Sequence, residues 1–381
     1  MIDLQRLVRF FVLDSLLLLK KPVPNPKTLL IIRVDGIGDY ILFRNFLEVI
    51  KNSIRFQNYK ITLCGSQAYK ELALTYDVNS ITDYLWVDNK KIKSRTFYRC
   101  KTFGKIRKRG YEVVLNPMYS RNSVCEDSIV RISGAIKKIG CVGDFVHAKS
   151  WEKYIFNRYY TELIDISPTT IFEFNKNKAF IEKVIATNIS IRKPSLPSEP
   201  KPTTTMRYAV LCPGALLRKK RWQTKNYIQI ARYLHLQYGI ASILVGDIHD
   251  RPSNEERRTL VELPFITDMI GKNNLVQTIA LIQGALLVVS NDTSIAHIGV
   301  AADVPVVVVS NGYHFGRFTE YPKEIYKSIF YVYPPDIMKS KLSFDELVAK
   351  FQYGSRLDIK TISLETVQLL IDKALNPLEF N

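Results

Sequence analysis

Short apolar runs that end in polar turns alternate with amphipathic segments along most of this 381-residue chain. The run at residues 29–34 leads through Asp-Gly-Ile-Gly-Asp into a segment with helical periodicity at residues 40–51. Similar runs follow at residues 60–64, 84–87 and 112–116. Apolar runs of this length between amphipathic helices are typical of buried parallel strands. The pattern therefore predicts an α/β fold made of strand–helix–strand units.

A second series of runs begins after a proline-rich segment. Residues 186–206 hold four prolines among serines and threonines, which is typical of a linker. Strands are predicted beyond it at residues 207–212, 241–245, 266–271, 286–289 and 306–309. We therefore predict two domains, at residues 27–190 and 207–360. An N-terminal amphipathic helix and connector are predicted over residues 1–26, and a C-terminal helix over residues 361–381 with Ser363 as its N-cap.

The polar turn at residues 290–293 is the most informative one in the chain. It joins the strand at 286–289 to a helical pattern that ends near Ala302. The free N–H groups and the dipole at the start of such a helix favour an anion, and Thr293 and His297 share one helix face. A phosphate could accept hydrogen bonds from both side chains. The alternative is a capped helix with Asn291 or Asp292 as its N-cap and His297 in the core.

The turn after the first strand contains Gly36, Gly38 and Asp39. The two glycines let the backbone turn tightly and leave room for a ligand. A dinucleotide fingerprint would need glycine in place of Ile41, and the lysine of a Walker loop is missing. Asp39 is therefore either a first-turn acid that the helix dipole favours, or a carboxylate that takes a proton from a hydroxyl.

Charge is the clearest bulk property of the chain. The formal net charge is +18, which attracts nucleic acid, an anionic membrane or a phosphorylated substrate without choosing among them. Residues 90–109 hold ten Lys or Arg and no acid, so they form either a solvated helix face or a cradle for an anionic acceptor. Five scattered cysteines without a CxxC pair indicate free thiols in a reducing compartment and give no support for zinc.

Residues 1–22 contain a ten-residue apolar stretch, Phe10 to Leu19, interrupted by Asp14 and Ser15. A membrane-spanning helix needs about 20 apolar residues, so this stretch is too short to cross a bilayer. Asp3 and Asp14 argue against a signal peptide. The segment also carries four cations, at Arg6, Arg9, Lys20 and Lys21. It is either an anchor on the membrane surface or a helix packed on its own domain.

Four motifs, taken in order, resemble the heptosyltransferase-like proteins of glycosyltransferase family 9. They are Leu29–Asp39, Pro213–Ala215 with Lys220–Trp222, Gly246–Asp250 and Ser290–His297. Family members have the GT-B fold, in which two Rossmann-like parallel-sheet domains face each other across a cleft. The resemblance therefore implies an N-terminal acceptor domain and a C-terminal nucleotide-sugar domain.

The resemblance also implies roles for individual residues. Asp39 matches the carboxylate that acts as catalytic base, Lys220 a lysine at the phosphates of the donor, and Asp250 an acid near the nucleotide ribose. The acceptor site is not identified by any motif, and the Lys90–Arg109 segment is the candidate for it.

The remaining donor contacts lie in the Ser290–His297 motif and beside the first glycine turn of the second domain. Asp292 matches a residue that faces the donor sugar, while Thr293 and His297 match contacts to the diphosphate. Gly214 belongs to the same donor set. So does Ser294, although it stands where the family usually has glycine.

The implied activity is that of an inverting, metal-independent glycosyltransferase without a cofactor. The donor would be a nucleotide sugar, by default ADP-heptose, and the acceptor a lipopolysaccharide core or a related anionic glycan. The protein would act in the cytoplasm or on the inner face of the cytoplasmic membrane, without nucleic acid as a partner. Two alternatives stay open, a non-catalytic protein that binds nucleotide sugars or anions, and a nucleic-acid-binding protein. The second is suggested by charge alone, without a helix-turn-helix, zinc or RNP motif.

Overall fold

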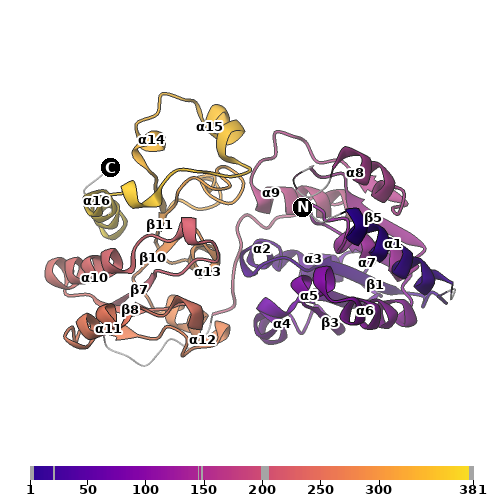
Figure 1. Ribbon diagram of the computed structural model, residues 1–381, viewed down its shortest axis with the longest axis horizontal. Helices are drawn as coiled ribbons and strands as arrows, with labels where there is room; N and C mark the ends of the chain where they lie inside the picture. The colour runs from indigo at the N-terminus through magenta and orange to yellow at the C-terminus, as the bar shows by residue number, and fades with distance from the viewer. Residues whose placement is uncertain (1–3, 20–21, 145, 147–148, 199–205, 377–381) are drawn as a thin grey trace. The chain divides into compact units, whose positions relative to one another are not determined.

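The computed structural model describes residues 4–19, 22–144, 146, 149–198 and 206–376. The chain divides into two compact units, Met1–Ser190 and Ile191–Asn381. The predicted N-terminal helix belongs to the first unit and the predicted C-terminal helix to the second. Lys20, Lys21 and residues 199–205 of the predicted linker lie outside the described residues. Figure 1 shows helices on both sides of the strands in each unit.

The first unit is built on a six-stranded parallel sheet in the order β3-β2-β1-β4-β5-β6. Its strands are β1 (Thr28–Arg33), β2 (Lys60–Ser66), β3 (Asp83–Val87), β4 (Val113–Asn116), β5 (Lys137–Cys141) and β6 (Glu162–Ile164). Its helices are α1 (Leu4–Leu18), α2 (Ile37–Ile41), α3 (Asn45–Asn52), α4 (Lys70–Tyr76), α5 (Asn89–Ser94), α6 (Thr96–Arg109), α7 (Glu126–Ser133), α8 (Ser150–Asn157) and α9 (Glu173–Ile185).

The second unit repeats this strand order in a parallel sheet arranged β12-β11-β10-β7-β8-β9. Its strands are β7 (Tyr208–Cys212), β8 (Ala241–Leu244), β9 (Ile266–Asp268), β10 (Leu287–Asn291), β11 (Val306–Val309) and β12 (Ile329–Val332). Its helices are α10 (Thr224–Tyr238), α11 (Asn254–Val261), α12 (Leu275–Gln283), α13 (Ser294–Ala301), α14 (Pro335–Met338), α15 (Phe344–Phe351) and α16 (Leu364–Leu375).

Both sheets therefore have the doubly wound order in which the strand sequence reverses beside the first strand. Ligands of such sheets bind where the carboxyl ends of the two strands at the reversal meet. These strands are β1 and β4 in the first unit, and β7 and β10 in the second. The prediction of an α/β fold with two Rossmann-like parallel sheets, as in the GT-B class, is confirmed.

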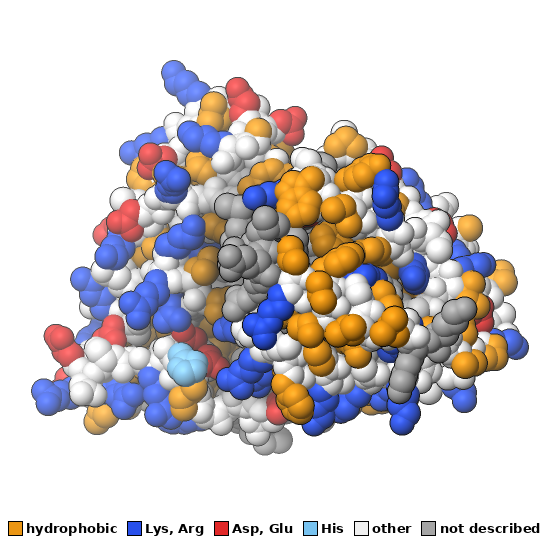
Figure 2. All heavy atoms as spheres, turned by 45° about the vertical axis from the view of Figure 1, so that its right-hand side comes forward, with side chains coloured by type: hydrophobic (Ala, Val, Ile, Leu, Met, Phe, Trp, Pro, Cys, Tyr) orange, Lys and Arg blue, Asp and Glu red, His pale blue; other side chains and the backbone are white. Residues whose placement is uncertain are grey.

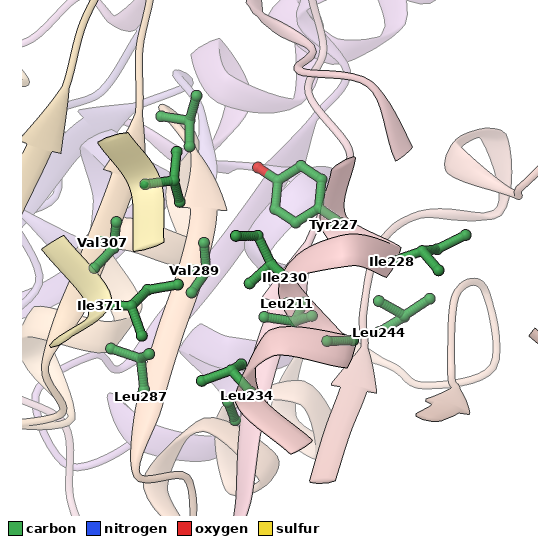
Figure 3. Close-up of a cluster of buried hydrophobic side chains, with 14 of the residues drawn as sticks. Leu211, Tyr227, Ile228, Ile230, Leu234, Leu244, Leu287, Val289, Val307 and Ile371 are labelled. Atoms are coloured by element: carbon green, nitrogen blue, oxygen red, sulfur yellow. The ribbon is translucent and has the colours of Figure 1, made fainter. Parts of the chain in front are cut away.

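Apolar side chains between sheet and helices hold each unit together. In the second unit, Leu211 and Val289 from the sheet pack against Ile230 and Leu234 of α10 and Ile371 of α16 (Figure 3). On the other face, α13 approaches the sheet so closely that a side chain at Gly299 would collide with Val306. The apolar residues that predicted the elements therefore form the core.

Several predicted elements differ from the structure. The expected helix at residues 40–51 is two helices, α2 and α3, separated by a short turn. Strand β5, which begins at Lys137 and Lys138, was not predicted; the backbone of these lysines pairs with β4 while their side chains lie toward the surface. The C-terminal helix does begin after Ser363, whose side chain accepts a hydrogen bond from the Thr366 N–H, as predicted.

Helix α1 packs on its own unit. The buried Asp14 carboxylate accepts a hydrogen bond from Arg99 Nε of α6 at 2.9 Å, and the Arg99 guanidinium lies between the rings of Phe10 and Phe103. Arg107 donates to the Leu18 carbonyl at 2.9 Å. The packed-helix alternative is therefore correct for the inner face of α1. None of the helices in the described part of the chain has the length and apolarity needed to cross a membrane.

Candidate functional site

The first polar edge lies where β1 ends and α2 begins. Asp39 Oδ2 accepts a hydrogen bond from the Gly36 N–H at 3.3 Å, so the carboxylate caps the helix that follows the strand. Arg33 Nη2 donates to the Asp39 backbone carbonyl at 3.0 Å. The side chain is half-buried rather than enclosed. Asp39 therefore caps the helix. Because its side chain is partly exposed, the carboxylate is also accessible to a ligand.

A second acid, Asp35, stands beside Asp39 and was not identified from the sequence. Its carboxylate pairs with Arg33 at 2.7 Å, and its Oδ1 atom is buried without a hydrogen-bond partner among the described residues. Burial raises the pKa of Asp35 well above its usual range, Arg33 opposes this shift, and the charges of Asp39 and Glu173 reinforce it. Asp35 thus places a second, mostly enclosed acid beside Asp39, with Arg33 as its counter-ion.

The second polar edge is formed by neighbouring strands β7 and β10. Asn291, the last residue of β10, donates to the Pro213 carbonyl at 2.7 Å and accepts from the Trp222 N–H at 3.0 Å. These bonds hold together three segments: the Pro-Gly-Ala turn after β7, the basic residues that precede Trp222, and the turn after β10. The expectation that Asn291 or Asp292 caps α13 is wrong, because Asn291 is used in these bonds. The N-cap is Thr293, whose hydroxyl accepts from the Ile295 N–H at 3.3 Å.

Lys220 and Asp292 form an ion pair with a 2.5 Å separation at this edge. Asp292 is buried and Lys220 is mostly so. The pair lies beside the start of α13, where Thr293 and Ser294 are half-buried. An ammonium group next to a helix N-terminus is a suitable environment for a phosphate. The predicted donor residues Lys220, Asp292, Thr293 and Ser294 are therefore brought together.

Gly214 and Asp250 also meet at this edge. A Cβ atom at position 214 would overlap the Asp250 carboxylate, so the space beside the turn depends on glycine. Asp250 pairs with Arg221 at 2.9 Å and accepts a hydrogen bond from the Asp247 N–H at 3.1 Å. The acid that the resemblance places near a ribose is thus held in position by Arg221.

His297 is buried on α13, one turn after Thr293. Its Nδ1 atom lies 2.7 Å from the Tyr321 hydroxyl. Burial lowers the pKa of His297 to about 4, with Asp292 opposing the shift and Lys220 reinforcing it. The imidazole is therefore neutral at pH 7, so the positive charge at this edge comes from lysine and arginine.

The loop after β11 adds aromatic residues that were not identified from the sequence. The Tyr313 ring lies under both neighbouring lysines, 4.3 Å from Lys219 Nζ and 5.5 Å from Lys220 Nζ. His314 packs against Tyr313, and burial lowers the pKa of His314 to about 4. The only signal in the sequence is the Asn-Gly-Tyr-His-Phe-Gly segment directly after a buried strand, where loops of open sheets meet their ligands.

The basic segment Lys90–Arg109 is divided between two ends of the first sheet. Helix α5 starts at its carboxyl end, because Asn89 donates to the Val34 carbonyl at 3.3 Å. Helix α6 runs back to the amino end, where Lys105, Lys108 and Arg109 line a cavity of about 690 Å³. Only the α5 portion therefore shares the end of the sheet that carries Asp39.

No group of three or more His, Cys, Asp or Glu side chains within the described ranges is arranged to hold a metal ion. The five cysteines are free thiols, as predicted, and burial raises the pKa of four of them, Cys64, Cys125, Cys141 and Cys212.

The chain is similar to proteins of known family and structure. The model of glycosyltransferase family 9 (heptosyltransferase) matches residues 99–314. Lipooligosaccharide heptosyltransferase 2 of Haemophilus influenzae is 36% identical over 102 residues, which are 26% of this chain and 29% of that protein.

Two solved structures are similar over nearly the whole chain. A family 9 glycosyl transferase from Veillonella parvula has a TM-score of 0.67 at 17% identity and covers 94% of this chain and 100% of its own. The heptosyltransferase WaaC of E. coli, solved with ADP, has a TM-score of 0.68 at 15% identity and covers 91% and 99%. At these identities the likeness shows the fold.

Proposed function

Because this chain belongs to glycosyltransferase family 9, we propose that it transfers a sugar from a nucleoside-diphosphate donor to a glycan acceptor. The observation that carries this proposal is the Lys220–Asp292 pair beside the start of α13, with the neutral His297 one turn further along. The family relationship gives the class of reaction, and this cluster supports our proposal for where the diphosphate of the donor binds.

The donor phosphates would lie over the first turn of α13. Lys220 would exchange its contact with Asp292 for a phosphate oxygen, which keeps the ammonium paired throughout. His297 would contribute through Nε2, since Nδ1 is held by Tyr321. Asp292, released from Lys220, could then accept a hydrogen bond from a sugar hydroxyl. These groups would stabilise the charge of the departing nucleoside diphosphate.

Asp39 would act as the general base. Its carboxylate would take the proton from the acceptor hydroxyl while the oxygen attacks the anomeric carbon of the donor sugar. The bond from that carbon to the diphosphate would break on the opposite face, so the anomeric configuration would invert. Lys220 and the N–H groups of α13 can balance the leaving charge, and we propose that the reaction needs no metal ion.

The relatives suggest the substrates. WaaC was solved with ADP and is named a heptosyltransferase, and the relative from H. influenzae is named for lipooligosaccharide. We therefore propose ADP-heptose as the donor and a lipopolysaccharide core or a related anionic glycan as the acceptor. A reaction in the cytoplasm, on the inner face of its membrane, agrees with the five free thiols.

A donor screen tests the proposal. ADP-, UDP-, GDP- and CDP-linked sugars would each be added to the full chain, and the donor that binds should raise the melting temperature. The same donor should then give a product of inverted configuration by NMR with an acceptor glycan, and EDTA should leave the rate unchanged. Donor binding without turnover on any acceptor would favour the non-catalytic alternative, and the absence of binding to any of the four would contradict the proposal.

A further inference from the structure

Helix α1 buries one face and exposes a second apolar face. Val8, Phe11, Val12, Leu16 and Leu19 follow one side of the helix and its C-terminal turn, with exposed fractions of 54%, 45%, 51%, 59% and 80%. Their spacing of three or four residues places them in a single stripe. These side chains are not required by the core of the unit, because the inner face of α1 is held by Phe10 and Asp14.

Helix α8 contributes a second set of exposed apolar side chains. Trp151, Tyr154 and Ile155 are 43%, 65% and 38% exposed. The two helices are joined through Arg131 of α7, whose guanidinium lies 4.1 Å from the Phe11 ring and 5.3 Å from the ring of Tyr159, just after α8. We call these exposed residues of α1 and α8 the α1–α8 face.

Figure 2, in which the side of Figure 1 that carries these helices comes forward, shows hydrophobic side chains gathered there with Lys and Arg around them. Arg9, Lys149 and Arg158 are exposed on the same two helices or at their ends. The Arg158 guanidinium lies 4.6 Å from the Tyr154 ring. The one acid of this part of α8, Glu152, accepts a hydrogen bond from the Lys149 N–H at 3.1 Å. The face thus combines an apolar centre with a cationic margin.

We propose that the α1–α8 face docks on the surface of an anionic lipid bilayer. Helices that lie at a bilayer surface have Trp, Phe and Leu directed into the lipid, with Lys and Arg near the phosphate groups. Trp and Tyr are favoured at this depth because one part of the ring is apolar and another forms hydrogen bonds. This inference concerns binding to a surface, and it does not depend on which sugar the protein transfers.

Charge favours a bilayer over a second copy of the chain. In a symmetric dimer the same face of both copies would meet, so the cationic margins would lie opposite each other and repel. Anionic lipid carries the complementary charge over an extended surface. The Asp14–Arg99 pair keeps α1 docked, so the face would bind as a rigid surface rather than as a released helix.

The test uses the full chain and vesicles of phosphatidylcholine with or without phosphatidylglycerol. The wild type should sediment with the vesicles that contain phosphatidylglycerol, and less so at high salt. Val12→Glu with Leu16→Glu should reduce the bound fraction at least tenfold. The matched control is Leu236→Glu with Leu369→Glu, which changes two leucines on α10 and α16 that are 77% and 54% exposed and should bind like the wild type. Melting curves of both variants should match the wild type.

Tryptophan fluorescence supplies a second readout. Trp151 is the exposed member of the three tryptophans, so its emission should shift to the blue on vesicle binding, and Trp151→Phe should remove that shift. The proposal is overturned if the wild type does not bind the anionic vesicles. It is also overturned if the α1 variant binds as well as its control, or if the α1 variant changes only a dimer equilibrium seen by analytical ultracentrifugation.

Discussion

The two units share one strand order and differ in where they place charge. In the first unit, the arginine–aspartate pairs Arg44–Asp77, Arg99–Asp14 and Arg121–Asp127 lie inside the fold, and Arg33–Asp35 lies at the carboxyl end of β1. In the second unit, the two least exposed pairs, Lys220–Asp292 and Arg221–Asp250, both lie at the carboxyl end of the sheet. The core beneath them is apolar (Figure 3).

We propose that this difference separates pairs that join elements of the fold from pairs that can contact a ligand. Arg44–Asp77 links the turn between α2 and α3 to the end of α4, and Arg99–Asp14 docks α1, so these pairs join elements. In the pairs of the second unit, Asp292 is buried, but the cations Lys220 and Arg221 stay partly exposed at the edge where a ligand would bind. A buried pair has no other partner to exchange with, whereas an edge pair can exchange its acid for a phosphate. The proposed donor role of the second-unit pairs therefore rests on their position in the fold rather than on the presence of an ion pair.

The largest effect is expected from Asp39→Asn. The amide keeps the size of the side chain and can still accept the Gly36 hydrogen bond, but it cannot take a proton. Turnover should fall by about 10²–10⁴-fold, the usual contribution of a positioned base, with donor affinity and melting unchanged. Steady-state kinetics and calorimetry would measure this. The control is Glu48→Gln, another first-turn acid of the same unit. Near-normal turnover in Asp39→Asn would reduce this residue to a helix cap.

Asp14→Asn should cost about 3 kcal/mol of unfolding free energy, because it leaves the Arg99 charge buried without its counter-ion. Chemical denaturation of the full chain would measure the loss. Asp14→Leu combined with Arg99→Met should recover much of it. In the second unit, Asp303→Asn breaks the more exposed Lys193–Asp303 pair and should cost less than about 1 kcal/mol. If Asp14→Asn and Asp303→Asn cost equal unfolding free energy, the buried pairs of the first unit do not differ from exposed pairs in their contribution to stability.

Lys220→Ala and His297→Ala should each weaken the binding of a nucleoside diphosphate by roughly 1–3 kcal/mol, as expected for charge-assisted and buried hydrogen bonds. Titration calorimetry would measure both affinities. Lys225→Ala removes an exposed lysine of α10 and should leave affinity unchanged. If all three variants bind alike, the diphosphate does not lie over α13.

The last prediction is an opposite response of the two units to pH. Burial lowers the pKa of His297 and His314 from 6.5 to about 4. Between these values the unfolded chain binds protons that the folded unit does not, so the second unit loses stability as the pH falls from about 6.5 to 4. Burial raises the pKa of Glu126 in the first unit from 4.5 to about 7, so its protonated form stabilises that unit as the pH falls from about 7 to 4.5.

Calorimetry of the full chain over this pH range would measure the two responses. His297→Gln should reduce the pH dependence of the unfolding transition of the second unit. Glu126→Gln should reduce that of the first unit. Burial also raises the pKa of Glu320, so this acid opposes the two histidines in part. If the unfolding temperatures of both units shift in the same direction as the pH falls, the opposite responses assigned to the two units are contradicted.

The sequence predicted the fold because the strands at the reversal points are continuous apolar runs. Three of these runs are buried, at residues 29–33, 208–212 and 306–309. Their residue types leave few alternatives to a buried strand. The strands that were missed, β5, β6 and β12, are either short or carry partly exposed side chains, so they lack a continuous apolar signal.

The proximity of the candidate site residues was predicted where they are close in sequence and missed where they are not. Asp292, Thr293 and His297 occur within one turn and helix, so their proximity follows from helical geometry. The neutral state of His297 depends on burial and on Tyr321, 24 residues later, which no local pattern indicates. The N-cap of α13 was predicted wrongly for a similar reason. The Asn291 side chain accepts a hydrogen bond from the backbone N–H of Trp222, which is distant in sequence, instead of capping the helix.

The buried pair between Asp14 and Arg99 also has a consequence for the order of events during synthesis. Its two residues are 85 positions apart, so α1 is complete before the ribosome has made the arginine that docks it. At roughly 5–20 residues per second, this interval lasts about 4–17 s. During that time the inner face of α1, with Phe10 and Asp14, has no partner on α6. A nascent chain would therefore present a two-sided apolar helix to chaperones and membranes, and only the finished unit limits the exposed surface to one side.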